Sequence, residues 1–86
     1  MAKILIIDDE KNIRDGIKKS LEYEGYEVAT AENGDKGIDI VYKGGIDLVI
    51  TDLKMPEKTG EEFLKDVLDF DKHIPCLLYT SDAADE

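Results

Sequence analysis

An unbroken apolar run that ends on acidic residues constrains this chain more than any other feature. Residues 4–7 read ILII and are followed at once by Asp8, Asp9 and Glu10. An apolar, β-branched run without polar alternation is typical of a strand buried on both faces of a parallel sheet. Parallel strands are joined by crossovers that usually contain a helix. The run therefore predicts an α/β fold with a group of acids at the carboxyl end of a strand.

The rest of the chain repeats this alternation of strands and helices. Ile13, Ile17 and Leu21 are four residues apart, which predicts a helix with one apolar face after the first strand. The other predicted elements are, in chain order, a strand over 26–31, a helix over 33–45, a strand over 46–51, a helix after Gly60 and a strand over 76–80. This order predicts a doubly wound parallel sheet with helices on both faces.

Length and charge exclude several classes of function. At 86 residues the chain makes at most one small domain. Its net charge of −10, from 21 acidic and 11 basic residues, argues against direct binding to nucleic acid or to an anionic membrane. The first apolar run is too short for a signal peptide or a membrane span, and a single cysteine fits a reducing compartment. We therefore expect a cytoplasmic protein.

A second strand also runs into an acid, because the segment over 46–51 is followed by Asp52. The carboxyl ends of parallel strands meet at one edge of the sheet, where ligands bind in folds of this kind. If the two strands are neighbours, Asp8, Asp9 and Asp52 lie together. Close carboxylates repel one another unless a cation lies among them, and Mg²⁺ is the cation that one or two carboxylates and several waters satisfy best. The sequence therefore predicts a magnesium site at this edge.

Several spaced motifs agree with a known family. The segments KILIIDDE (3–10), AENG (31–34) and DLVITDLKMP (47–56), together with Gly60, resemble the receiver domain of two-component response regulators over residues 2–75. The resemblance implies a flavodoxin-like receiver fold with the strand order 2-1-3-4. The fifth strand and the last two helices of that fold are expected to be missing from the chain.

The resemblance also implies a role for individual residues. Asp52 matches the phosphoacceptor that takes a phosphoryl group from a sensor histidine kinase or phosphotransfer protein, and Asp8 and Asp9 match the acidic pair that holds Mg²⁺. The backbone carbonyl of Lys54 matches a further metal ligand, and Thr80 matches the hydroxyl residue that hydrogen-bonds the phosphoryl group. The implied module is a switch and not an enzyme, and it regulates an attached or partner output, such as transcription. Without the family's fifth strand we expect that it cannot switch.

The segment over 76–86 is predicted to have a different origin from the rest of the chain. The segment CLLYTSDAADE (76–86) back-translates into the end sequence and adaptor of a transposase-based DNA library. We therefore expect residues 1–75 to be the receiver part and 76–86 to be a non-native tail that mimics strand four. On this interpretation the match of Thr80 to the family is a coincidence.

Other classes of function fit the residues less well. An aspartate-based phosphatase also uses an acid at a strand end and expects a second acid two residues later. That position is Lys54 after Asp52 and Glu10 after Asp8. A fragment without function is the remaining alternative. His73 is expected to be an exposed loop residue, and Cys76 a small apolar residue without a nucleophilic role.

Overall fold

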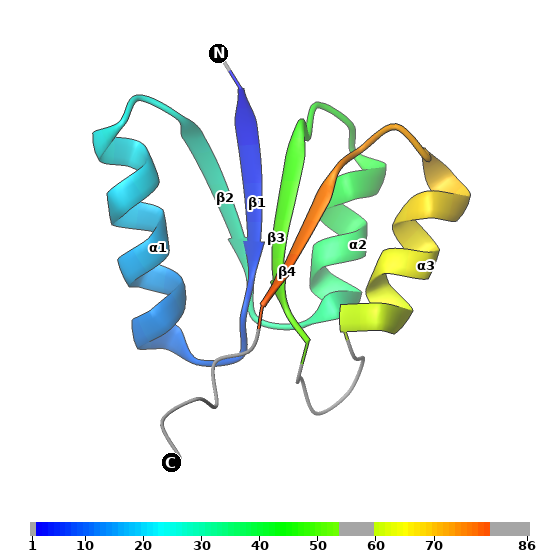
Figure 1. Cartoon of the computed structure of the whole chain (residues 1–86), viewed down its shortest axis with the longest axis horizontal. Coiled ribbons are helices and arrows are strands. Elements are labelled where there is room, and N and C mark those ends of the chain that lie inside the picture. The colour runs from blue at the N-terminus through cyan, green and yellow to red at the C-terminus, as the bar shows by residue number, and fades with distance from the viewer. Residues whose placement is uncertain (1, 54–59, 80–86) are drawn as a thin grey trace.

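Four parallel strands form one sheet in the order β2-β1-β3-β4, as the family resemblance implied (Figure 1). The computed structural model describes residues 2–53 and 60–79. The elements are, in chain order, β1 (Lys3–Ile7), α1 (Lys11–Tyr23), β2 (Glu27–Ala31), α2 (Gly34–Tyr42), β3 (Leu48–Asp52), α3 (Gly60–Phe70) and β4 (Cys76–Tyr79). No helix in the part of the chain that the structure describes is long and apolar enough to cross a membrane.

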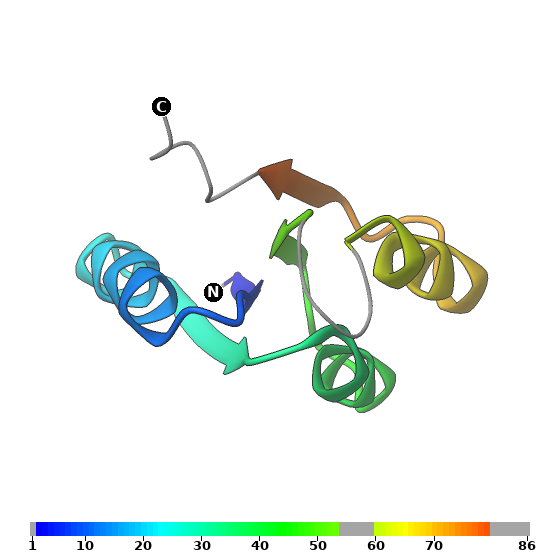
Figure 2. The ribbon, with the colours of Figure 1, turned by 90° about the horizontal axis from the view of Figure 1, so that it is seen from below.

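Helices cover both faces of the sheet. Helix α1 lies on one face, and α2 and α3 lie together on the other (Figure 2). Right-handed crossovers explain this arrangement, because the chain changes direction across the sheet. It runs from β1 to β2 at one edge, and then from β2 past β1 to β3 and β4 at the other edge. We call the two sides of the sheet the α1 face and the α2/α3 face.

The main core lies on the α2/α3 face. Its buried residues are Leu5, Ile7, Ala31, Ile38, Val41, Ile46, Val49, Phe63 and Val67. Because side chains alternate along a strand, Ile4 and Ile6 of β1 point the other way, toward α1. Helix α1 has no fully buried residue, and its predicted apolar positions Ile13, Ile17 and Leu21 are only half-buried.

The helix ends agree with the sequence pattern. Asn33 caps α2, because its side-chain oxygen accepts a hydrogen bond from the Lys36 amide at 2.8 Å. Gly25 follows the end of α1 with a φ of 97°, a left-handed conformation that glycine adopts without strain. These ends fix where each helix returns the chain to the sheet.

The register of the sheet brings three strand ends to one level. Ile7 of β1 pairs with Thr51 of β3, and Asp52 pairs with Tyr79 of β4. The Asp8 amide then donates to the Ala31 carbonyl at 3.2 Å, which extends the β1–β2 pairing by one residue. Asp8, Asp52 and Tyr79 therefore lie side by side at the carboxyl edge of the sheet.

Candidate acidic site at the carboxyl edge of the sheet

The acids predicted from sequence converge. One carboxylate oxygen from each of Asp8, Asp9 and Asp52 lies within 4.8 Å of the others. Asp8 and Asp52 are fully buried, whereas Asp9 is exposed. The cluster thus has two acids inside the protein and one at its opening to solvent.

Asp8 is held in place by contacts on both sides of its carboxylate. One oxygen, Oδ1, accepts the Glu10 amide at 2.7 Å. The other, Oδ2, accepts the hydroxyl of Tyr79. The backbone carbonyl of Asp8 accepts a hydrogen bond from Arg14 Nη1 of α1 at 2.7 Å. These contacts fix the turn between β1 and α1 and orient the Asp8 carboxylate toward the cluster.

Asp52 is the last residue of β3, and the alternation of that strand sets its direction. Val49 belongs to the core of the α2/α3 face, so Thr51 shares that face while Asp52 points to the α1 face. The register of β1 puts Asp8 on the α1 face as well, since Leu5 and Ile7 belong to the opposite core. Two buried carboxylates thus face each other across adjacent strands.

Tyr79 also belongs to this site, although no sequence pattern predicted it. It is the last residue of β4, and its hydroxyl donates to Asp8. Burial raises the pKa of the Tyr79 hydroxyl far above its usual range, and the hydrogen bond to Asp8 and the charges of Asp8, Asp52 and Asp9 raise it further. The signal that could have identified Tyr79 is its position, because it ends the fourth apolar run at the edge where the acids end theirs.

The cluster fits a hard divalent cation. It offers three oxygen ligands within the small region that one ion occupies, and Mg²⁺ prefers carboxylate oxygens together with water. Two predicted participants, Lys54 and Thr80, lie outside the described residues, so their roles stay predictions. His73 is exposed, as expected, and lies 3.5 Å from Asp71 through its Nδ1 atom, in the turn before β4 and outside the cluster.

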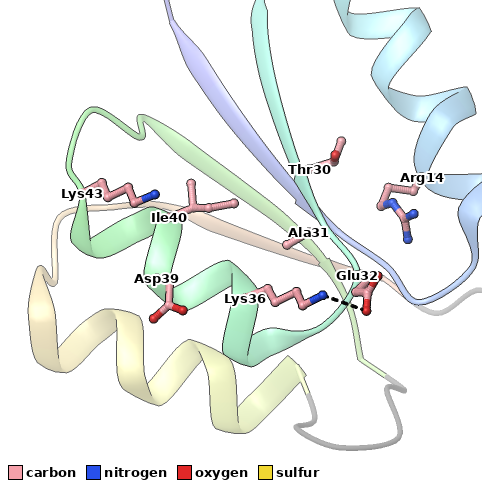
Figure 3. Close-up of a pocket in the computed structure, with 8 residues that line it drawn as sticks. All are labelled: Arg14, Thr30, Ala31, Glu32, Lys36, Asp39, Ile40 and Lys43. Atoms are coloured by element: carbon pink, nitrogen blue, oxygen red, sulfur yellow. Dashed lines mark hydrogen bonds and ion pairs between the residues drawn. The ribbon is translucent and has the colours of Figure 1, made fainter.

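A separate pocket of about 370 Å³ lies beside the edge strand β2. Residues of α1, β2 and α2 line it, as do Glu32, which follows β2, and Lys43, which follows α2 (Figure 3). They are Arg14, Thr30, Ala31, Glu32, Lys36, Asp39, Ile40 and Lys43. Lys36 and Glu32 form an ion pair of 3.1 Å within it. The clustered acids do not line this pocket. Arg14 lines it and also donates a hydrogen bond to the backbone carbonyl of Asp8.

Known proteins of one family resemble this chain in sequence and in fold. The family model of the response regulator receiver domain matches residues 4–86. The uncharacterized transcriptional regulatory protein YkoG of Bacillus subtilis (strain 168) is 38% identical over 78 residues, which cover 91% of this chain and 34% of YkoG. The chain thus spans about a third of the length of this curated relative.

Two solved structures share the fold over almost the whole chain. The first is a complex of the histidine kinase ThkA with the response regulator TrrA (TM-score 0.88, 39% identity), a match over 100% of this chain and 76% of the solved chain. The second is TrrA from Thermotoga maritima in complex with Mg²⁺-BeF (TM-score 0.82, 30% identity), a match over 98% of this chain and 91% of the solved chain.

Proposed function

The chain belongs to the response regulator receiver domain family, and on this premise we propose that it is a phosphoacceptor module whose nucleophile is Asp52. The observation that carries the proposal is the convergence of Asp52 with Asp8 and Asp9 at one edge of the sheet. An isolated acid at a strand end has many explanations. Three acids from two strands that meet at one point match the site that the family resemblance implies.

The proposed reaction is the transfer of a phosphoryl group from a phosphohistidine to Asp52. A carboxylate oxygen of Asp52 attacks the phosphorus, so that an O–P bond forms and the N–P bond of the donor breaks. The electron pair of the broken bond returns to the imidazole nitrogen of the donor, which takes up a proton. The product is an aspartyl phosphate, and the added charge then biases the conformation of the surrounding surface.

The proposed cofactor is Mg²⁺, held by Asp8, Asp9 and Asp52. When it is bound, the ion offsets the negative charge that develops on the transferred oxygens. Asp8 and Asp52 supply rigid, oriented oxygens, whereas Asp9 lies at the solvent side, where it can meet a hydrated ion first. The Mg²⁺-BeF complex of TrrA, which has the same fold, supports this assignment.

The proposed donor is a sensor histidine kinase or a phosphotransfer protein. The solved ThkA–TrrA complex supports a kinase partner, and the name of YkoG supports an output in transcription. We place the module in the cytoplasm, where it acts as a switch phosphorylated once per molecule and not as an enzyme with turnover. The net charge of −10 disfavours direct contact of this part with nucleic acid.

Phosphorylation of the chain by acetyl phosphate and magnesium chloride tests the proposal. Intact mass spectrometry should show one added phosphoryl group, stable in acid and labile in base. Asp52→Asn removes the nucleophile at nearly constant volume and should abolish the addition. The matched control is Asp39→Asn in α2, outside the cluster, which should be labelled like the unmodified chain. Labelling that persists in Asp52→Asn would contradict the assignment, and multiple turnovers on a free phosphomonoester would favour a phosphatase.

Magnesium binding offers a second test that needs no donor. A ligand that binds only the folded state stabilises it by about 2.7 kcal/mol at a concentration of a hundred times Kd. We therefore expect MgCl₂ to raise the melting temperature of the chain and of Asp39→Ala, but not that of Asp9→Ala. Equal shifts in both variants would contradict a metal site formed by the cluster.

A further inference from the structure

The side chain of Tyr79 reaches across a strand to the acidic site. Its hydroxyl donates to Oδ2 of Asp8, although Tyr79 lies on β4 and Asp8 follows β1. Strand β3 separates these two strands in the sheet. The Tyr79 side chain must therefore pass over the end of β3, and the residue of β3 paired with Tyr79 is Asp52.

The alternation of β4 puts Tyr79 on the same face as the acids. Cys76 packs against the core of the α2/α3 face, so Leu77 and Tyr79 point to the α1 face. Asp8 and Asp52 point to that face as well. The ring of Tyr79 consequently lies over the Asp52 side chain on its way to Asp8.

The two acids combine a position at the edge of the sheet with complete burial. Asp8 and Asp52 lie at the edge of the sheet, yet each has 0% of its surface exposed. Mg²⁺ gives up its waters reluctantly and usually keeps several of them in an octahedral shell. A phosphoryl donor must likewise approach an oxygen of Asp52 in line with the bond that breaks. Neither can reach the buried oxygens while the side chains stay where they are.

We propose that Tyr79 weakens metal binding and slows phosphoryl transfer at this site, because its hydroxyl occupies Oδ2 of Asp8 and its side chain crosses the position of Asp52. Loading requires the hydroxyl to leave Asp8 and the ring to turn away from Asp52. The inference rests on the proposed function, since it concerns the same site. It applies to the chain as it stands, including the segment after residue 75 that the sequence analysis attributed to an adaptor.

Two substitutions separate the hydroxyl from the ring. Tyr79→Phe removes only the hydrogen bond to Asp8, whereas Tyr79→Ala also removes the ring over Asp52. Tyr23→Phe is the matched control, because Tyr23 is 89% exposed at the end of α1 and loses the same hydroxyl. Isothermal titration with MgCl₂ gives Kd for each form, and mass spectrometry follows the rate of labelling by acetyl phosphate.

We expect magnesium to bind Tyr79→Phe about tenfold more tightly than the unmodified chain, since a hydrogen bond to a charged group no longer competes. Tyr79→Ala should bind at least as tightly and should be labelled faster. Tyr23→Phe should match the unmodified chain in both measurements. Circular dichroism confirms that each form is folded, and if Tyr79→Ala does not fold, Tyr79→Phe alone decides the question.

Each other outcome has a distinct meaning. Equal Kd values in the unmodified chain and both Tyr79 variants would overturn the role of Tyr79 and leave the proposed function intact. Weaker binding by Tyr79→Phe would also overturn it, because the hydroxyl would then support the bound ion. If no form binds magnesium, the metal site of the proposed function fails, and the role of Tyr79 fails with it.

Discussion

The two faces of the sheet are built differently. On the α2/α3 face, strands and helices contribute fully buried side chains to one core, such as Leu5 from β1 and Phe63 from α3. On the α1 face the strand residues Ile4 and Ile6 are buried, but the helix above them has no buried residue. Leu77 of β4 points to the α1 face and is 57% exposed. The α2/α3 face is thus densely packed, whereas the helix on the α1 face covers the sheet less completely.

The chemistry lies on the face with the looser cover. Asp8, Asp52 and Tyr79 all point to the α1 face at the carboxyl edge, whereas the core of the α2/α3 face consists of apolar side chains. A carboxylate in a well-packed apolar core would lose its hydration without gaining partners. At the edge of the α1 face, Asp8 instead accepts hydrogen bonds from Glu10 and Tyr79. The difference indicates that one face stabilises the sheet and that the other carries the site.

The largest expected effect tests this division through core truncation. Phe63→Ala removes a fully buried ring from the α2/α3 face and should lower the free energy of unfolding by about 3–5 kcal/mol. Leu21→Ala removes a half-buried side chain from α1 and should cost about 1–2 kcal/mol. Urea denaturation followed by circular dichroism measures both values. Equal losses would show that α1 packs as tightly as α3.

Two glycines allow a smaller test of the same comparison. A Cβ at Gly37 of α2 would clash with Ile7 Cδ1 and lie 3.2 Å from Phe63 Cε1, both in the core. Gly37→Ala should therefore destabilise the chain by about 1–3 kcal/mol. A Cβ at Gly16 of α1 meets nothing within 4 Å, so Gly16→Ala should stabilise it by about 0.5–1 kcal/mol. The sign of the change in urea midpoint separates the two faces, and two changes of the same sign would contradict the comparison.

The smallest expected effect concerns alkaline pH. The folded state raises the pKa of Tyr79 above the value of about 10 for a free tyrosine. The stability that comes from this shift is fully present below pH ~10 and is lost as pH rises further, because only the unfolded chain releases the proton. Unfolding midpoints measured from neutral to alkaline pH should fall less steeply in Tyr79→Phe than in the unmodified chain. Parallel curves would mean that Tyr79 does not hold its proton in the folded state.

The elements and the acids were predictable because each depends on local pattern. The run ILII followed by Asp8 and the segment ending at Asp52 predicted both strand ends, and the structure confirms that these acids converge. Asn33 begins the predicted helix over 33–45, and its side chain accepts the Lys36 amide as a helix cap does. Cys76 packs against the core as a small apolar residue, and burial raises the pKa of its thiol.

The contact between Tyr79 and Asp8 was not predictable in the same way. It joins residues far apart in the chain, and it depends on strand order, register and the face of β4 at once. A change of one residue in the register of β4 would turn Tyr79 to the opposite face. A sequence pattern that located Asp52 could therefore not show that the side chain paired with it crosses to Asp8.

The order of strands along the chain also sets an order in time. During synthesis β1, β2 and β3 emerge before β4, and the β1–β3 pairing that brings Asp8 level with Asp52 involves none of the later residues. Tyr79 joins the sheet only when β4 pairs with β3. The strands that position the acids therefore leave the ribosome before the strand that carries Tyr79, which is the last of the four to become available for pairing.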